Sequence, residues 1–335
     1  MQTFVECVTW PGLLPALEHE VQALGWPYML DTRREAVRLP VAYSDRVGRL
    51  RCVQSAFVGS VYPVPRPKAL LGQQYWDDIV MIAQRIMREQ RFTTLEIDAA
   101  GAESSVMQRI ATTLAERLAL QSVKDEGELV VRIRPAEQGW EVLLRLTPRP
   151  HGTRTWRVCN MPGALNAVVA AAMVRWAGVF ADERVLNMGV GSGTLLIERL
   201  LAGATQHAWG CDTNPEAIAC AQQNVAAAGV ATHVQLTDWD ATRVPLPSAS
   251  VDVIMADLPF GQLIGTHQLN LTLYPQWVAE AARLLAPQGR MVLISHENRL
   301  LEQVLHATAG IAVAERLQVK VGGMAPIAWL IRRDH

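Results

Sequence analysis

The sequence predicts an α/β protein in which a doubly wound, Rossmann-like sheet in the C-terminal half follows an N-terminal α+β region. Three observations support this fold class. Strand-like and helix-like segments alternate from Arg184 onward, a glycine-rich turn follows the first of those strands, and the first half mixes short strands with amphipathic helices. A length of 335 residues suits two or three domains, which we expect at 1–65, 66–157 and 158–335.

The elements of the first two domains follow from apolar periodicity. They are strands at 4–8, 56–62, 94–98, 129–134 and 140–147, with helices at 13–24, 45–54, 73–89 and 103–119. Gly25 ends the first helix. Three prolines, Pro63, Pro65 and Pro67, form a stiff link, and the first domain boundary is therefore expected there.

The third domain is predicted as a series of βαβ units. Its strands are expected at 184–188, 208–212, 233–236, 251–256 and 290–295, with a closing pair at 312–321 and 327–332. One intervening helix has clear end signals. Asn214 can cap it, Pro215 suits its first turn and Gly229 ends it.

The composition is that of an ordinary globular protein, with 50% hydrophobic residues, 19% charged residues and a net charge of −1. The longest apolar run, at 165–180, is too short and too interrupted to cross a bilayer. No signal-peptide pattern opens the sequence, so a cytoplasmic protein is expected. The five cysteines are scattered without a C-x-x-C pair, which predicts reduced thiols and no metal site.

A glycine-rich turn, Gly189-Val190-Gly191-Ser192-Gly193, follows the strand at 184–188, with Asn187 before it and Thr194 after it. Glycines here allow tight dihedrals and let a ligand approach the backbone. A tight turn without a ligand is one alternative. A nicotinamide site is another, but its third small residue would fall on Thr194, which fits that pattern poorly. The turn therefore predicts a different nucleotide cofactor.

Two acidic residues extend this candidate cofactor site. Asp212 ends the second strand, where a carboxylate can accept hydrogen bonds from both ribose hydroxyls. Asp240 follows the third strand and could accept from an adenine amino group. Asp238 is an alternative for that role, and a helix cap is an alternative role for Asp240.

The tetrapeptide Asp257-Leu258-Pro259-Phe260 ends the apolar strand at 251–256. An exocyclic aromatic amine is a poor nucleophile because its lone pair is delocalised into the ring. Two acceptors for its two hydrogens, the Asp257 carboxylate and a main-chain carbonyl such as that of Leu258, would localise that pair. Phe260 could stack on an extruded base, and Pro259 would stiffen the turn. The order of the motifs predicts methyl transfer from S-adenosylmethionine to a nucleobase nitrogen. The alternative is a plain turn with Phe260 in the core.

This tetrapeptide resembles that of the THUMP-domain RNA guanine-N2 methyltransferases, especially the tRNA-acting branch. The motif residues that continue the resemblance are His267, Asn270, Leu273-Tyr274-Pro275 and Gly289-Arg290. It covers residues 158–335 and implies a class I methyltransferase fold. It also implies S-adenosylmethionine as the methyl donor and a guanosine amino group in structured RNA as the acceptor.

The resemblance implies roles for individual residues. The residues implied to bind the cofactor are Gly189, Gly191, Gly193 and Asp212, with Asp240 near the adenine. The residues implied to hold the acceptor amine are Asp257, Leu258, Pro259 and Phe260. Asn187 departs from the family, which has Asp at that position. Its neutral side chain would not pair with the methionine ammonium, so weaker cofactor binding is one expectation.

Residues 1–157 resemble the ferredoxin-like and THUMP regions of the same family, which implies an RNA-docking module. Arg132 and Arg134 share one side of a strand, Arg145 and Arg149 share one side of the next, and Arg154 follows. Guanidinium groups over paired strands suit phosphate contact, and a solvated sheet face is the alternative. We therefore predict that these five arginines contact RNA, with tRNA as the partner.

Other functions are compatible with the sequence. The same chemistry could act on guanine in ribosomal RNA, an adenine amine in DNA or a glutamine amide in a protein. A non-catalytic RNA-binding protein with a decayed cofactor pocket is a further alternative, which Asn187 favours.

Overall fold

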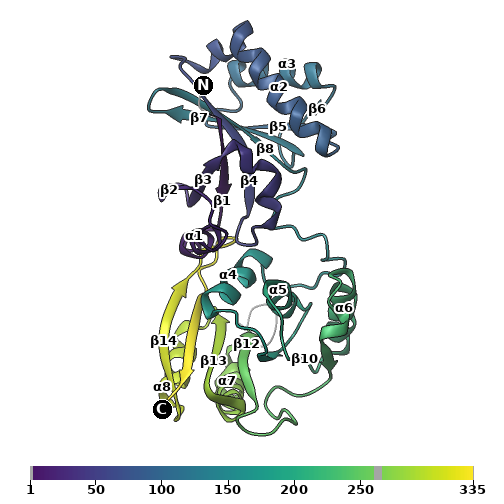
Figure 1. Ribbon diagram of the computed structural model, residues 1–335, viewed down its shortest axis with the longest axis vertical. Coiled ribbons are helices and arrows are strands. Elements are labelled where there is room, and N and C mark those ends of the chain that lie inside the picture. The colour runs from purple at the N-terminus through teal and green to yellow at the C-terminus, as the bar shows by residue number, and fades with distance from the viewer. Residues whose placement is uncertain (1–2, 260–265, 335) are drawn as a thin grey trace. The chain divides into compact units, whose positions relative to one another are not determined.

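The structure is a computed structural model that describes residues 3–259 and 266–334. The chain divides into two compact units (Figure 1). The first comprises the residues up to Thr9 together with Leu17–Gly152, and the second comprises Trp10–Ala16 and the residues from Thr153 onward. Each unit has its own sheet, and the predicted α/β class is confirmed.

The first unit contains an eight-stranded sheet in the order β2-β3-β1-β4-β8-β7-β5-β6. Its strands are β1 (Thr3–Val8), β2 (Met29–Asp31), β3 (Ala36–Pro40), β4 (Ser55–Tyr62), β5 (Thr94–Ala99), β6 (Gln121–Ser122), β7 (Leu129–Ala136) and β8 (Gly139–Arg145). The helices along this part of the chain are α1 (Leu14–Ala23), η1 (Val41–Arg49), η2 (Pro67–Leu71), α2 (Gln73–Glu89) and α3 (Ser105–Leu118). Since β4 and β8 pair antiparallel along their lengths, one sheet runs across the boundary expected at residue 65.

Two features of this unit differ from the prediction. The prediction of an α-helix at 45–54 is wrong, because residues 41–49 form the 3₁₀ helix η1. The buried side chain of η1 is Val47. One buried apolar residue is too little to hold an amphipathic α-helix against the core. Strands β2 and β3 were not predicted. In β2, both Met29 and Leu30 are exposed, so the alternation that marks a strand is missing.

The second unit contains a seven-stranded sheet in the order β11-β10-β9-β12-β13-β15-β14. Its strands are β9 (Arg184–Met188), β10 (His207–Cys211), β11 (Gln235–Thr237), β12 (Val251–Asp257), β13 (Leu285–Ser295), β14 (Ile311–Gln318) and β15 (Ile327–Arg333). Strands β9 to β13 are parallel neighbours, and β15 is antiparallel to both β13 and β14. The strand order reverses at β9, so the doubly wound sheet is confirmed.

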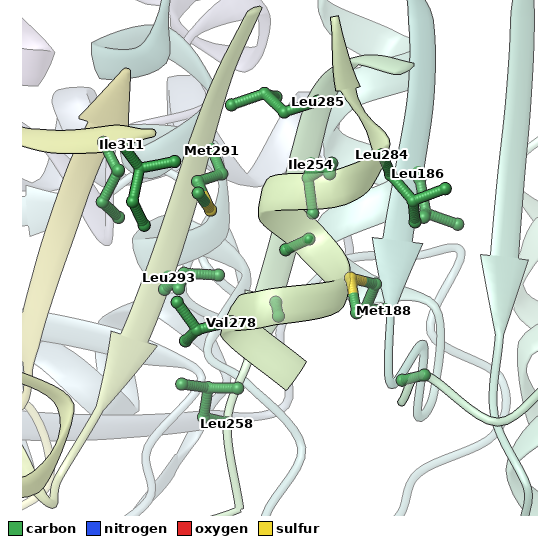
Figure 2. Close-up of a cluster of buried hydrophobic side chains, with 14 of the residues drawn as sticks. Leu186, Met188, Ile254, Leu258, Val278, Leu284, Leu285, Met291, Leu293 and Ile311 are labelled. Carbon is green, nitrogen blue, oxygen red and sulfur yellow. The ribbon is translucent and has the colours of Figure 1, made fainter. Parts of the chain in front are cut away.

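Helices cover both faces of this sheet. They are α4 (Ala167–Ala177), α5 (Thr194–Ala202), α6 (Pro215–Ala227), η3 (Ala231–His233), α7 (His267–Leu284) and α8 (Asn298–Ala307). One core cluster joins α4, α5 and α6 through Ala167, Ile197 and Val225. The larger cluster packs Val278 of α7 and residues of α8 against β9, β12 and β13 (Figure 2). In the part of the chain that the structure describes, no helix is long and apolar enough to span a membrane.

The predicted capping of α6 is confirmed. The Asn214 side chain accepts a hydrogen bond from the Glu216 amide at 2.9 Å, and Pro215 is the first helical residue. Gly229, with φ +71°, follows the helix end. The caps thus fix the position of α6 along the chain.

The turn at 10–16 belongs to the second unit. The Pro11 carbonyl accepts a hydrogen bond from the Lys320 amide at 3.0 Å. A Cβ atom on Gly12 would lie 2.1 Å from the carbonyl oxygen of Gln318, so only glycine fits there. The structure separates the units after Gly152, five residues before the boundary expected at 157.

Candidate active site

A pocket of about 460 Å³ lies at the carboxyl ends of β9, β10 and β12. This edge is where ligands of doubly wound sheets bind. Eight of the predicted site residues line it: Asn187, Gly189, Gly191, Thr194, Asp212, Asp240, Asp257 and Pro259. Gly193 caps α5 and Leu258 packs in the core, while Phe260 lies outside the described residues. The individual roles of these residues stay predictions.

The glycine-rich turn has the backbone that its sequence predicts. Gly189, Gly191 and Gly193 have φ of +64°, +51° and +84°, values that glycine adopts without strain. The Gly191 amide donates to Oδ2 of Asp212 at 3.0 Å, which ties the turn to the end of β10. Trp277 of α7 packs against the turn, since a Cβ atom on Gly189 would lie 2.6 Å from the Trp277 ring.

Asp240 lines the pocket, whereas Asp238 is not among the lining residues. The structure therefore favours Asp240 for the adenine. Its Oδ1 accepts hydrogen bonds from the amide and hydroxyl of Thr242, both at 2.8 Å, so the carboxylate is held in place.

We expect Asp240→Ala to weaken S-adenosylmethionine binding about fivefold, since one hydrogen bond contributes roughly 1 kcal/mol. Asp238→Ala, which removes an exposed carboxylate outside the pocket, should leave the affinity unchanged. Calorimetric titration of both variants with the cofactor measures the difference. Equal losses would show that the two carboxylates act through general charge rather than through contact with the adenine.

Asn187 lines the pocket and carries a buried acceptor. Its Nδ2 donates to the Met255 carbonyl of β12 at 3.0 Å, which sets the orientation of the amide. Its Oδ1 is buried and has no partner within the described residues. A buried acceptor in this state costs free energy unless a ligand donates to it. An aspartate at this position could not donate to Met255, so the departure from the family pattern has a local structural reason.

The charge of the pocket suits a cationic ligand. Along the described lining, the ionisable side chains are the carboxylates of Asp212, Asp240 and Asp257, with no Lys or Arg. Three acidic groups attract positive charge. S-adenosylmethionine carries a sulfonium and an ammonium, so the lining and the Asn187 acceptor both fit it.

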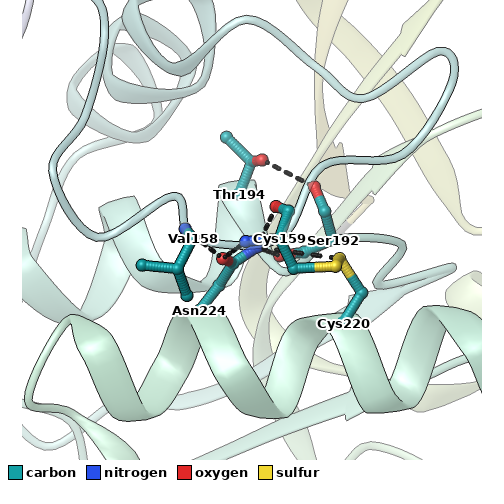
Figure 3. Close-up of a disulfide and its surroundings, with 6 residues drawn as sticks. All are labelled: Val158, Cys159, Ser192, Thr194, Cys220 and Asn224. Atoms are coloured by element: carbon teal, nitrogen blue, oxygen red, sulfur yellow. Dashed lines mark hydrogen bonds between the residues drawn. A yellow bond between two sulfur atoms is a disulfide. The ribbon is translucent and has the colours of Figure 1, made fainter.

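One wall of the pocket is the segment from Met161 to Leu165, which precedes α4. Asn224 of α6 accepts from the amides of Val158 and Cys159, both at 2.9 Å. It also donates to the carbonyls of Cys159 and Ser192, at 2.9 and 2.8 Å (Figure 3). Asn224 therefore joins this segment to the glycine-rich turn.

The prediction that all five cysteines are reduced is wrong. Cys159 and Cys220, 61 residues apart, form a disulfide beside Asn224 (Figure 3). The two meet because the segment after Arg157 and the helix α6 both pack against the glycine-rich turn. The other three cysteines, Cys7, Cys52 and Cys211, are buried thiols.

Asp257 is the carboxylate at the end of β12. Its side chain is half-buried at the pocket, and burial raises the pKa of its carboxyl to about 7 because the charged form is poorly solvated. The next residue, Leu258, has its side chain in the core (Figure 2) and its amide bonded to the Ile294 carbonyl at 3.0 Å. The carbonyl of Leu258 has no donor among the described residues, so it is the main-chain group of this residue that is left for the predicted contact with an amine.

Three of the five arginines predicted to contact RNA have internal partners. The Arg134 guanidinium bonds Glu6 and Glu141 at 2.6 and 2.7 Å. Arg154 is buried and pairs with Glu198 at 2.8 Å. Arg145 donates to the main-chain carbonyls of Gly127, Glu128, Thr147 and Pro148. Turning these side chains outward would leave buried acceptors unsatisfied. RNA contact by Arg134, Arg145 and Arg154 stays a prediction, and it would have to compete with these internal bonds.

Arg132 and Arg149 stay candidates for RNA contact. Arg132 pairs with Asp98 at 2.7 Å and stacks on Phe57, with 30% of its side chain exposed. Arg149 is exposed beyond the end of β8. Both belong to the first unit.

Sequence reasoning missed Trp277, Asn224 and Arg157 as parts of the site. Arg157 donates to Thr194 Oγ1 and to the Leu165 carbonyl, both at 2.7 Å, and so links the wall to the start of α5. Asn224 could have been found, because it interrupts the otherwise apolar buried stripe of α6. No local pattern marks Trp277, since only the fold brings α7 over the glycine-rich turn.

The sheet order with antiparallel β15, together with an acidic cofactor pocket at the carboxyl edge, defines a class I methyltransferase. The chain belongs to the RMKL-like methyltransferase domain family, whose model matches residues 154–327. The resemblance drawn from residues 158–335 is thereby confirmed. The protein is a methyltransferase.

Individual relatives agree with this family. A tRNA (guanine(6)-N2)-methyltransferase of Thermus thermophilus is 26% identical over 353 residues, which cover 98% of this chain and 99% of that protein. A tRNA (guanine(6)-N(2))-methyltransferase of Mus musculus is 28% identical over 192 residues, 51% of this chain and 37% of that protein. The solved structure of TrmN from Thermus thermophilus matches with a TM-score of 0.78 at 22% identity, covering 99% of this chain and all of that one.

Proposed function

We propose that this enzyme methylates the exocyclic N2 amino group of a guanosine in tRNA. The observation that carries the proposal is the Asp257 carboxylate at the pocket, followed by Leu258, whose carbonyl has no hydrogen-bond donor within residues 3–259 and 266–334. The similarity to the Thermus thermophilus tRNA (guanine(6)-N2)-methyltransferase over the full length of both chains supports this acceptor. An enzyme that acts on tRNA would work in the cytoplasm.

The two acceptors at the strand end explain how the chain could activate an aromatic amine. S-adenosylmethionine supplies a methyl carbon made electrophilic by its sulfonium. The Asp257 carboxylate and the Leu258 carbonyl would each accept one N–H of the amine, so its lone pair is drawn out of conjugation. These bonds strengthen as positive charge develops on the nitrogen, and they therefore stabilise the transition state more than the ground state. Asp257 then receives the released proton.

Methyl transfer is expected to slow as the pH falls below about 7. Asp257 acts as a carboxylate, and burial raises its pKa to about 7, so acidification replaces an acceptor with a hydroxyl donor. Well below the pKa, the single-turnover rate should drop about tenfold per pH unit. Rates measured from about pH 5 to 9 with RNA binding checked at each pH provide the test. A flat profile across this range would contradict a catalytic Asp257 with a raised pKa.

The first unit is proposed to dock the RNA. Arg132 and Arg149 are the candidates for phosphate contact, and the family resemblance of residues 1–157 is the support for this role. Loss of one phosphate contact should reduce the slope of log binding constant against log salt concentration by about 1, because about one counterion fewer is released from the RNA.

The proposed reaction is tested by incubating unmodified tRNA with the enzyme and labelled S-adenosylmethionine, followed by digestion and mass spectrometry of the nucleosides. The expected product is N2-methylguanosine at one position. Asp257→Ala should yield none while binding tRNA as tightly as the wild type. Methylation found instead in ribosomal RNA, in DNA adenine or in a protein amide would replace tRNA as the acceptor.

The non-catalytic alternative has lost its main support. Asn187, which favoured it, lines the pocket with its Nδ2 bonded to the Met255 carbonyl and its Oδ1 without a partner among the described residues. If calorimetry detects S-adenosylmethionine binding, the alternative of a decayed cofactor pocket is excluded.

A further inference from the structure

The carbonyl of Pro259, two residues after Asp257, accepts two hydrogen bonds from α7. Tyr274 Oη donates at 2.7 Å and Asn270 Nδ2 donates at 2.8 Å. These two residues are four positions apart, so they lie on one face of the helix. Both are fully buried, at 0% exposure.

Chemistry fixes the direction of every bond in this network. A carbonyl can only accept, so the Tyr274 hydroxyl hydrogen points at Pro259 and the Ser295 hydroxyl, at 2.7 Å, donates to Tyr274 Oη. Ser295 Oγ accepts from the Glu297 amide at 2.9 Å, and a Glu297 carboxylate oxygen accepts from Asn270 at 2.5 Å. Burial raises the pKa of Tyr274, which keeps its phenol a donor.

This arrangement immobilises the main chain on both sides of the Leu258 carbonyl. On one side, the Leu258 amide is bonded to Ile294 of β13 at 3.0 Å. On the other side, the two donors from α7 occupy both lone pairs of the Pro259 carbonyl. Between these anchors the proline ring fixes φ, so the direction of the Leu258 carbonyl is determined. The Pro259 carbonyl itself has no lone pair left for an acceptor amine.

We propose that Asn270 and Tyr274 are positioning residues for methyl transfer, which jointly hold the Pro259 carbonyl so that the Leu258 carbonyl and the Asp257 carboxylate face the same amine. This inference rests on the proposed function. It assigns to α7 a part in catalysis that requires no contact with the substrate.

Stability alone does not account for these polar groups. Asn270 is buried with its Oδ1 lacking a partner within the described residues, a state that costs free energy. The network instead converges on a carbonyl of a pocket residue, where a misplacement of about 1 Å can slow a reaction about a hundredfold.

The test compares Tyr274→Phe with Tyr62→Phe at saturating tRNA and cofactor. Tyr62 is also fully buried, and its hydroxyl donates to Asp78 at 2.7 Å in the first unit, so each variant loses one buried phenol hydroxyl. We expect Tyr274→Phe to lower kcat about tenfold with KM for tRNA and S-adenosylmethionine unchanged. Tyr62→Phe should keep the wild-type kcat.

Two further readouts separate positioning from a general loss of stability. Asn270→Ala combined with Tyr274→Phe should lower kcat by more than the product of the single effects, because in each single variant the remaining donor still restrains the carbonyl in part. In Tyr274→Phe the acid limb of the pH–rate profile should move below about 7, since a looser turn admits water to Asp257. The other titratable groups of the network are Glu297 and the exposed His267 that bonds it.

The proposal is overturned if wild-type enzyme methylates tRNA guanosine and Tyr274→Phe does so with the same kcat and the same pH midpoint. An equal fall in kcat for Tyr62→Phe would overturn it as well. If the wild type methylates no guanosine in tRNA, the proposed function fails first and the inference fails with it. Should the double variant not fold, the single Tyr274→Phe comparison still decides.

Discussion

Exchange of Asp257 for Asn is expected to lower the rate of methyl transfer about 10²- to 10⁴-fold. The amide keeps the shape of the side chain, but it loses the negative charge that would stabilise the developing ammonium and receive its proton. S-adenosylmethionine binding should change little, since the residues predicted to bind it, Asp212, Asp240 and Asn187, are unchanged. Single-turnover methylation of tRNA measures the effect, and a variant within about tenfold of the wild-type rate would exclude Asp257 as the catalytic carboxylate.

The same variant is expected to be more stable than the wild type at alkaline pH. The pKa of Asp257 is raised from 3.8 to about 7 in the folded protein, so the buried charge costs stability in full above pH 7 and progressively less down toward pH 4. Asn carries no charge at any pH. The gain in Tm should therefore be large near pH 8 and smaller near pH 5, as scanning calorimetry can show.

A control for this stability gain lies on the same strand. Asp252, near the start of β12, pairs with Arg184 at 2.8 Å, and that hydrogen-bonded partner lowers the pKa of Asp252. Asp252→Asn should consequently lose stability at pH 8 where Asp257→Asn gains it. Changes of the same sign in both variants would contradict a cost specific to the buried carboxylate.

The features that could be predicted are those marked by residues close to them in the sequence. Strand β9 was predicted at its observed bounds because a short apolar run and a glycine-rich turn delimit it. The pocket residues Asp212 and Asp257 were predicted because side chains that follow parallel strands gather at one edge of the sheet. Each signal lies within a few residues of the feature that it predicts.

The parts that could not be predicted depend on distant partners. Strand alternation tells on which side Arg134 lies, but not that Glu6, 128 residues away, occupies its guanidinium. The same holds for the disulfide of Cys159, whose partner lies on a helix that packs nearby only in the folded chain. Tyr274 was noted as part of a motif, yet its bond to the Pro259 carbonyl is a tertiary contact with no local sequence signal.

A second carboxylate, Glu183, lies at the amino ends of the parallel strands, whereas Asp257 lies at their carboxyl ends. Unlike Asp257, it is paired with cations. Glu183 precedes β9 and is buried, with Oε2 bonded to Arg199 at 2.8 Å and Oε1 bonded to Arg290 at 2.6 Å. Arg290 also donates to two main-chain carbonyls at the end of α4. This carboxylate thus balances two buried cations, whereas Asp257 pairs with no cation among the described residues.

We therefore expect Glu183→Gln to destabilise the second unit by about 3 to 5 kcal/mol, because it leaves two buried guanidinium groups without their counter-charge. Asp252→Asn breaks the neighbouring ion pair of Arg184, which is about one-third exposed, and should cost roughly 1 kcal/mol or less. Urea unfolding of both variants measures the two costs. Below the unfolding transition, Glu183→Gln should still bind S-adenosylmethionine with wild-type affinity, since its contacts lie at the edge of the sheet away from the pocket. The contrary result would be a Glu183→Gln variant that binds S-adenosylmethionine more weakly but unfolds at the wild-type urea concentration. It would mean that Glu183 influences the pocket, and that its ion pairs do more than stabilise the fold.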